Sequence, residues 1–131
     1  MNYLGDEAME YLIDDTRPIF VQVAERIEED ILAGRLAEEE QVPSTNQFAA
    51  LYQINPATAA KGVNLLVDQG ILYKKRGLGM YVAPGARTRL LAKRREHFYE
   101  QYVVPMLQEA ERLGITPEQL TEMMQRRVKV P

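Results

Sequence analysis

The sequence has no cysteine and a single histidine among its 131 residues. Without cysteine, the chain has neither a disulfide framework nor a thiolate metal site. No apolar run approaches the ~20 residues that a membrane-spanning helix needs. The start of the chain, Met1 to Asp6, lacks the basic and apolar regions of a secretory signal. We therefore expect a cytoplasmic protein that does not associate with membranes.

The scarcity of cysteine and histidine also limits the options for catalysis and metal binding. We find no nucleophile motif and no phosphate-binding glycine loop, so the sequence predicts no enzyme. His97 lies near Glu96 and Glu100, which permits two interpretations, a metal ligand or an exposed surface residue. A lone histidine is far more often the second. We expect no metal and no cofactor.

Charge is distributed unevenly along the chain, although the net charge is only −3. Residues 1–42 carry twelve acidic and three basic side chains, and residues 43–95 carry nine basic and one acidic. Residues 96–131 carry six acidic and four basic side chains. The basic middle segment favours a phosphate-binding face there.

The first predicted helix covers Phe20 to Leu32, where apolar residues recur at spacings of three and four. Pro18 suits its first turn and Gly34 its end. Its acidic side chains are Glu25, Glu28, Glu29 and Asp30. They permit a cation site or a solvated face, and since calcium-loop spacing is missing we expect the solvated face. Before this helix, Met9 to Ile13 give a weak strand signal.

Two short helices with strong start signals follow. Ser44, with Gln47 three residues later, predicts a capping box at the start of the first. Asn55 and Pro56 interrupt that helix and begin the second as its N-cap and first residue. Gly70 ends the second helix. This pattern is typical of a helix-turn-helix.

A predicted hairpin completes the motif. Its strands cover Ile71–Lys75 and Met80–Ala83 and are joined through Arg76 to Gly79. Gly77 and Gly79 permit the positive φ angles of a tight turn, and basic residues precede the tip. A helix-turn-helix followed by such a hairpin predicts a winged helix-turn-helix.

Residues Arg87 to Leu113 predict a long helix, which Pro105 should kink or split, and Thr116 caps a last short helix. The apolar stripe on these helices permits two interpretations, a small cofactor pocket or a subunit interface. Two helices of this size cannot close a large pocket alone, so we favour a homodimer interface. Its predicted residues are Leu91, Phe98, Tyr102, Met106, Leu120 and Met123.

The predicted fold is therefore mainly α with a small β wing. Residues 1–85 form an N-terminal winged helix-turn-helix domain that binds DNA. Residues 86–131 form a short C-terminal helical region for dimerisation or for binding an effector.

Each part of the motif suggests a way to contact double-stranded DNA. The second helix of a helix-turn-helix meets base edges with its N-terminal residues. The start of the preceding helix can hold a phosphate, and a basic wing can follow the backbone or enter the minor groove. The predicted contacts are Ser44, Thr45, Asn46, Asn55, Ala57, Thr58, Lys61, Lys75, Arg76, Gly77 and Gly79. The alternative is a winged-helix module that binds protein and uses its basic face only for solubility.

In order along the chain, these motifs resemble the GntR family of bacterial transcription regulators. The resemblance covers about Arg17 to Val82 and rests on Pro18-Ile19-Phe20, Gln22, Gly34, Pro43-Ser44, Asn55-Pro56-Ala57-Thr58, Lys61, Gly70-Ile71-Leu72 and Gly77-Leu78-Gly79-Met80-Tyr81-Val82. Asn46, Pro56 and Ala60 stand where many members carry arginine. The short C-terminal region is similar to the YtrA-type subfamily. The resemblance implies a homodimer on a partly palindromic operator, usually a repressor, and leaves open whether a small-molecule effector controls it.

Overall fold

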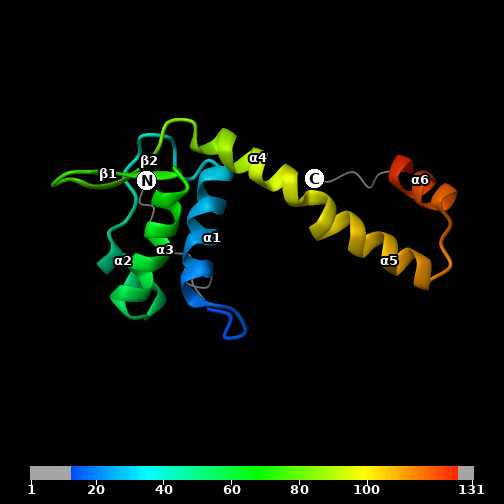
Figure 1. Cartoon of the computed structure of the whole chain (residues 1–131), viewed down its shortest axis with the longest axis horizontal. Helices are drawn as coiled ribbons and strands as arrows, with labels where there is room; N and C mark the ends of the chain where they lie inside the picture. Colours follow the sequence, from blue (N-terminus) through cyan, green and yellow to red (C-terminus); the bar gives the residue numbers. More distant parts are fainter. Residues whose placement is uncertain (1–12, 127–131) are drawn as a thin grey trace. The chain divides into compact units, whose positions relative to one another are not determined.

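The computed structural model describes residues 13–126 (Figure 1). Most of the weak strand expected at Met9 to Ile13 lies outside these residues. The chain forms two compact units that divide between Ala92 and Lys93, and each unit is described by itself. The functional domain boundary expected after residue 85 stays a prediction.

Helices and a hairpin build the first unit, which confirms the mainly α fold with a β wing. Its elements are α1 (Ile19–Leu32), α2 (Thr45–Tyr52), α3 (Pro56–Asp68), β1 (Leu72–Lys75), β2 (Gly79–Val82) and the start of α4 (Ala86–Phe98). The two strands are antiparallel, with Leu72 opposite Val82 and Lys75 opposite Gly79. In Figure 1 the hairpin extends beyond the helices that carry it.

A single core joins these elements. The apolar stripe of α1 packs with residues of α2, α3, the hairpin and the start of α4. Its buried members include Val23, Ile27, Ile31, Phe48, Val63, Leu66, Leu72, Val82, Ala86 and Leu90. Because each helix of the motif contributes to this core, the outer faces of α2 and α3 are held in fixed positions.

Gly62 allows α1 and α3 to touch. A Cβ atom at this position would lie 2.6 Å from the backbone oxygen of Phe20 and 3.0 Å from the Cβ of Val23. Real Cβ atoms do not approach a backbone oxygen so closely. The two helices therefore pack at a distance that only glycine permits.

The acidic side of α1 differs from the solvated face that we expected. Asp30 is 0 % exposed, and its carboxylate forms ion pairs with Arg26 at 3.2 Å and with Arg35 at 2.7 Å. Glu28 is also buried. The prediction is wrong for these two residues. At Asp30 the reason is that the loop after α1 folds back against the helix. That loop supplies Arg35, and the N–H of Leu36 donates to the carbonyl of Asp30 at 3.0 Å.

A short backbone pairing extends the hairpin on the edge of β2 away from β1. The N–H groups of Glu39 and Val42 donate to the carbonyls of Val82 and Met80, at 2.8 and 2.9 Å. Gln41 lies opposite Tyr81 in this pairing. The segment before α2 therefore supports the wing, which local sequence signals did not indicate.

The second unit continues the helical chain. Beyond α4 it contains the π-helical turn η2 (Tyr99–Val103), α5 (Val104–Arg112) and α6 (Pro117–Arg126). Within residues 13–126, no helix has the length and apolar character needed to cross a bilayer.

The disruption expected at Pro105 takes the form of a π-helical turn. The N–H of Val104 donates to the carbonyl of Tyr99, five residues back. A proline inside a helix lacks an N–H and crowds the carbonyl four residues before it. A wider turn just ahead of Pro105 accommodates that residue without ending the helix.

Candidate nucleic-acid interface

The start of α2 is fixed by the capping box that the sequence predicts. The N–H of Gln47 donates to Oγ of Ser44 at 3.1 Å, and the N–H of Ser44 donates to Oε1 of Gln47 at 2.7 Å. The first N–H groups of a helix have no carbonyl partner within it and point out of its end. At Thr45 and Asn46, this end of the helix is therefore suited to a phosphate oxygen.

The start of α3 is equally well defined. Oδ1 of Asn55 accepts the N–H of Ala57 at 2.7 Å, and Pro56 occupies the first helical position. Ala57 and Lys61 are exposed and, four residues apart, lie on one face of the helix. Thr58 beside them is partly exposed. The predicted base-reading residues thus share the outer face of the first turns of α3.

Lys61 has a defined position because it contacts α1. Its Nζ lies 4.2 Å from the centre of the Phe20 ring. Such a cation–π contact contributes about 0.5–1 kcal/mol at an exposed site, and it holds the ammonium group beside the start of α3. The sequence placed Phe20 in the core stripe of α1, and its contact with the lysine was missed.

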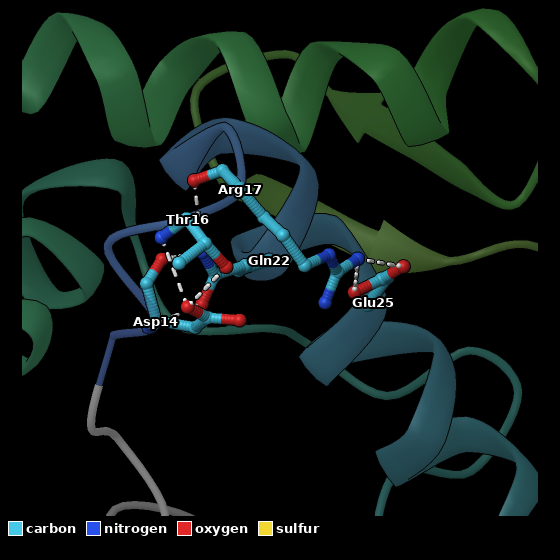
Figure 2. A network of polar contacts seen from close by, with 5 residues as sticks. All are labelled: Asp14, Thr16, Arg17, Gln22 and Glu25. Carbon is cyan, nitrogen blue, oxygen red and sulfur yellow. Dashed lines mark hydrogen bonds and ion pairs between the residues drawn. The ribbon is translucent and has the colours of Figure 1, made fainter.

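A polar network fixes the chain just before α1 (Figure 2). Oδ1 of Asp14 accepts the N–H and the hydroxyl of Thr16, at 2.9 and 2.6 Å. These hydrogen bonds lower the pKa of the Asp14 carboxyl below its ordinary value. Gln22 reaches back from α1, donating to the carbonyl of Asp14 at 2.6 Å and accepting its N–H at 2.8 Å. The network therefore anchors the turn to the same end of α1 that carries Phe20.

Arg17 completes this network by lying along α1. Its Nη2 is 2.6 Å from Oε1 of Glu25, and the hydrogen bond raises the pKa of Arg17. Both side chains are nearly half exposed. An ion pair of that kind adds little to stability, so its main effect is to orient Arg17.

Aromatic residues organise the base of the wing. The Nζ of Lys75 lies 4.2 Å from the ring centre of Tyr81 and 5.9 Å from that of Tyr73. The two tyrosines are partners across the strands, with ring centres 6.1 Å apart. The hydroxyl of Tyr73 donates to Oε2 of Glu39 at 2.6 Å, which raises the pKa of the tyrosine. The lysine predicted to contact DNA is therefore held against a braced aromatic surface and is partly exposed there.

The tip of the wing is a tight turn. Gly77 and Gly79 have φ angles of +78° and +109°, as the predicted turn requires. Nε2 of Gln41 donates to the carbonyl of Leu78 at 2.7 Å. Arg76 is exposed at this tip, and so is Leu78. Sequence reasoning missed Gln41 and Leu78, because neither belongs to a charged or glycine pattern.

Part of the basic charge serves the fold. Nη1 of Arg89 donates to the carbonyls of Gly70 and Pro84, each at 3.0 Å. Gly70 follows the end of α3, where cationic groups stabilise the free carbonyls. Arg89 therefore ties the start of α4 to the end of α3.

The second unit exposes much of its apolar surface. Phe98 and Tyr102 are 56 % and 63 % exposed, and their ring centres are 5.6 Å apart. The other large exposed apolar residues here are Tyr99, Met106, Leu107, Leu113, Met123 and Met124. Of the predicted interface residues, Leu91 and Leu120 are partly buried. Among the described residues, no cluster of three His, Asp or Glu side chains offers a metal site.

Comparison with known proteins gives consistent results. The model of the family described as bacterial regulatory proteins, gntR family, matches residues 20–82, from α1 to the end of the wing. The HTH-type transcriptional repressor YtrA of Bacillus subtilis (strain 168) is 29 % identical over 105 residues, which are 80 % of each chain.

Solved structures agree with this match. A putative transcriptional regulator of the GntR family from Bacteroides thetaiotaomicron is 32 % identical, with a TM-score of 0.68 over 82 % of this chain and 94 % of that one. The DNA-binding domain of AraR in complex with operator ORX1 is 29 % identical, with a TM-score of 0.50. That match covers 54 % of this chain and 87 % of the AraR chain. The similarity to the AraR DNA-binding domain thus concerns about half of this chain.

Proposed function

Because the chain belongs to the gntR family of bacterial regulatory proteins, we propose that it is a cytoplasmic, sequence-specific DNA-binding transcription repressor. The observation that carries the proposal is that the starts of two capped helices and a basic wing are all exposed. These lie in the segment with nine basic side chains and one acidic. The similarity to the repressor YtrA supports repression rather than activation. The family is one of regulators, and we propose no catalytic activity.

Each part of this surface has a separate role in the proposed complex. The first turns of α3 enter the major groove, where Thr58 and Lys61 meet base edges and Ala57 allows close approach. The N–H groups of Thr45 and Asn46 hold a phosphate ahead of α2. Arg76 and Lys75 of the wing contact the DNA backbone next to the segment that α2 and α3 bind.

We propose further that the protein binds a partly palindromic operator as a homodimer. The exposed apolar stripe that includes Phe98, Tyr102 and Met106 supports this proposal, since such a surface is commonly buried against another chain. In a dimer, two copies of α3 would read half-sites about one helical turn apart.

The dependence of binding on salt separates this proposal from a protein-interaction module. The experiment measures fluorescence anisotropy of a labelled mixed-sequence duplex of about 40 base pairs, titrated with protein between about 50 and 200 mM salt. Because each neutralised phosphate releases counterions, a DNA-binding surface with several contacts gives a steep linear loss of log affinity with log salt. A chain that leaves the duplex unbound even at the lowest salt would contradict DNA binding.

A further inference from the structure

The wing carries an apolar side chain where its charge alone would predict polar ones. Leu78 is 61 % exposed at the tip of the hairpin. In the described part of the first unit, no other large apolar side chain is exposed to this degree. A single exposed leucine is ordinary on a protein surface. This one, however, lies in the turn of the hairpin, two positions after Arg76, on the surface that we assign to DNA.

The turn holds Leu78 in a fixed backbone position. Its N–H donates to the carbonyl of Lys75 at 2.9 Å, and its carbonyl accepts Nε2 of Gln41 at 2.7 Å. Both backbone polar groups of Leu78 are thus engaged within the protein. The N–H, the backbone group that could donate to a phosphate, is therefore already used, and the side chain is what this residue presents to a ligand.

The surroundings of Leu78 indicate which ligand it meets. Lys74, Lys75 and Arg76 lead into the tip, and cationic side chains of this kind hold phosphates. A phosphate backbone offers nothing to a leucine, whereas the minor groove exposes sugar walls and base steps. Proteins insert leucine and similar side chains there as apolar wedges that distort the duplex.

We propose that Leu78 enters the minor groove of the operator as an apolar wedge, while Lys75 and Arg76 hold the phosphates beside that groove. This inference rests on the proposed function, and it adds a contact that base reading by α3 does not require. Gln41 acts as a positioning residue because it fixes the carbonyl of Leu78. A protein partner for the tip is the competing outcome.

The test compares Leu78→Ala with the unaltered protein on a duplex enriched from a random pool. Removing the branched end of leucine should weaken binding by about tenfold per subunit, the effect of apolar carbons that would be buried on binding. The slope of log affinity against log salt should not change, because no phosphate contact is lost. The DNA bend, measured by fluorescence transfer between labelled duplex ends, should become smaller.

Two further variants serve as controls. Leu78→Met keeps an apolar side chain of similar size and should retain both affinity and bend. Arg76→Ala should instead flatten the salt slope by about one unit. Since Leu78 is exposed, the thermal unfolding of each Leu78 variant should match that of the unaltered chain.

Replacing guanine by inosine next to the half-sites provides an independent check. The change removes the amino group from the minor groove and leaves the major-groove acceptors in place. Affinity of the unaltered protein should change at these positions, and that of Leu78→Ala should change much less.

The outcomes distinguish the two proposals. If the unaltered protein binds no DNA, the proposed function fails and the wedge fails with it. If the unaltered protein binds but Leu78→Ala shows the same affinity and bend, only the wedge is overturned.

Discussion

Substituting Gly62 tests whether α1 and α3 pack so closely that only glycine fits between them. In Gly62→Ala, the added Cβ would lie 2.6 Å from the backbone oxygen of Phe20. That oxygen cannot rotate away, so the helices must separate. Overpacking costs about 1–3 kcal/mol, and the better helix propensity of alanine returns up to about 1 kcal/mol. We expect a net loss of about 1–2 kcal/mol in the free energy of unfolding.

Urea unfolding followed by circular dichroism measures this loss as a lower midpoint with an unchanged slope. The matched control is Asn64→Ala, which places an alanine at an exposed position of the same helix. It should change stability by no more than about 0.5 kcal/mol. If Gly62→Ala were as stable as Asn64→Ala, the packing argument would be refuted.

Three other substitutions test separate parts of the account. Asp30→Ala removes a buried carboxylate that pairs with two arginines and should cost about 2 kcal/mol in urea unfolding. An unchanged urea midpoint would show that these ion pairs add nothing to the free energy of unfolding. Arg76→Ala should lower the salt slope of DNA binding by about one, whereas the exposed Arg112→Ala should leave it unchanged. Tyr102→Asp should sediment as a monomer, because a charge would have to be buried in the proposed interface. If the Tyr102→Asp variant were still a dimer, the subunit interface would not include Tyr102.

The elements of the helix-turn-helix were predictable because their signals are local. Ser44 and Gln47 form the predicted capping box, and Asn55 caps α3 as expected. Gly77 supplies a positive φ in the wing turn. Each signal involves residues only a few positions apart, so the backbone geometry follows from the residue types. The strand limits differ from the prediction by one residue at the ends.

The features that the sequence did not reveal depend on distant segments. Burial of Asp30 requires Arg35 and the loop that returns to α1. The pairing of Gln41 with the wing joins residues about forty positions apart, and no periodicity in either segment indicates it. The capping of α3 by Arg89 also depends on a contact across the hairpin. From the distribution of charge along the sequence, Arg89 was assigned to the phosphate-binding face.

The candidate site shows the same limit. The sequence identified the helix starts and the basic wing, because caps and charges are visible in the residue types. It did not indicate that Lys61 rests on Phe20 or that Gln41 holds the tip of the wing. Those contacts decide how rigidly the predicted residues are presented, and they follow from tertiary packing.

Selection of bound duplexes from a random pool, together with the mass of the protein–DNA complex in solution, tests the central claim most directly. A dimeric, sequence-specific regulator should enrich an inverted repeat with half-sites about one helical turn apart, bound by two copies of the chain. A pool that remains unenriched at low salt, or a specific complex that contains a single copy, would contradict the account of a dimeric, sequence-specific DNA-binding regulator.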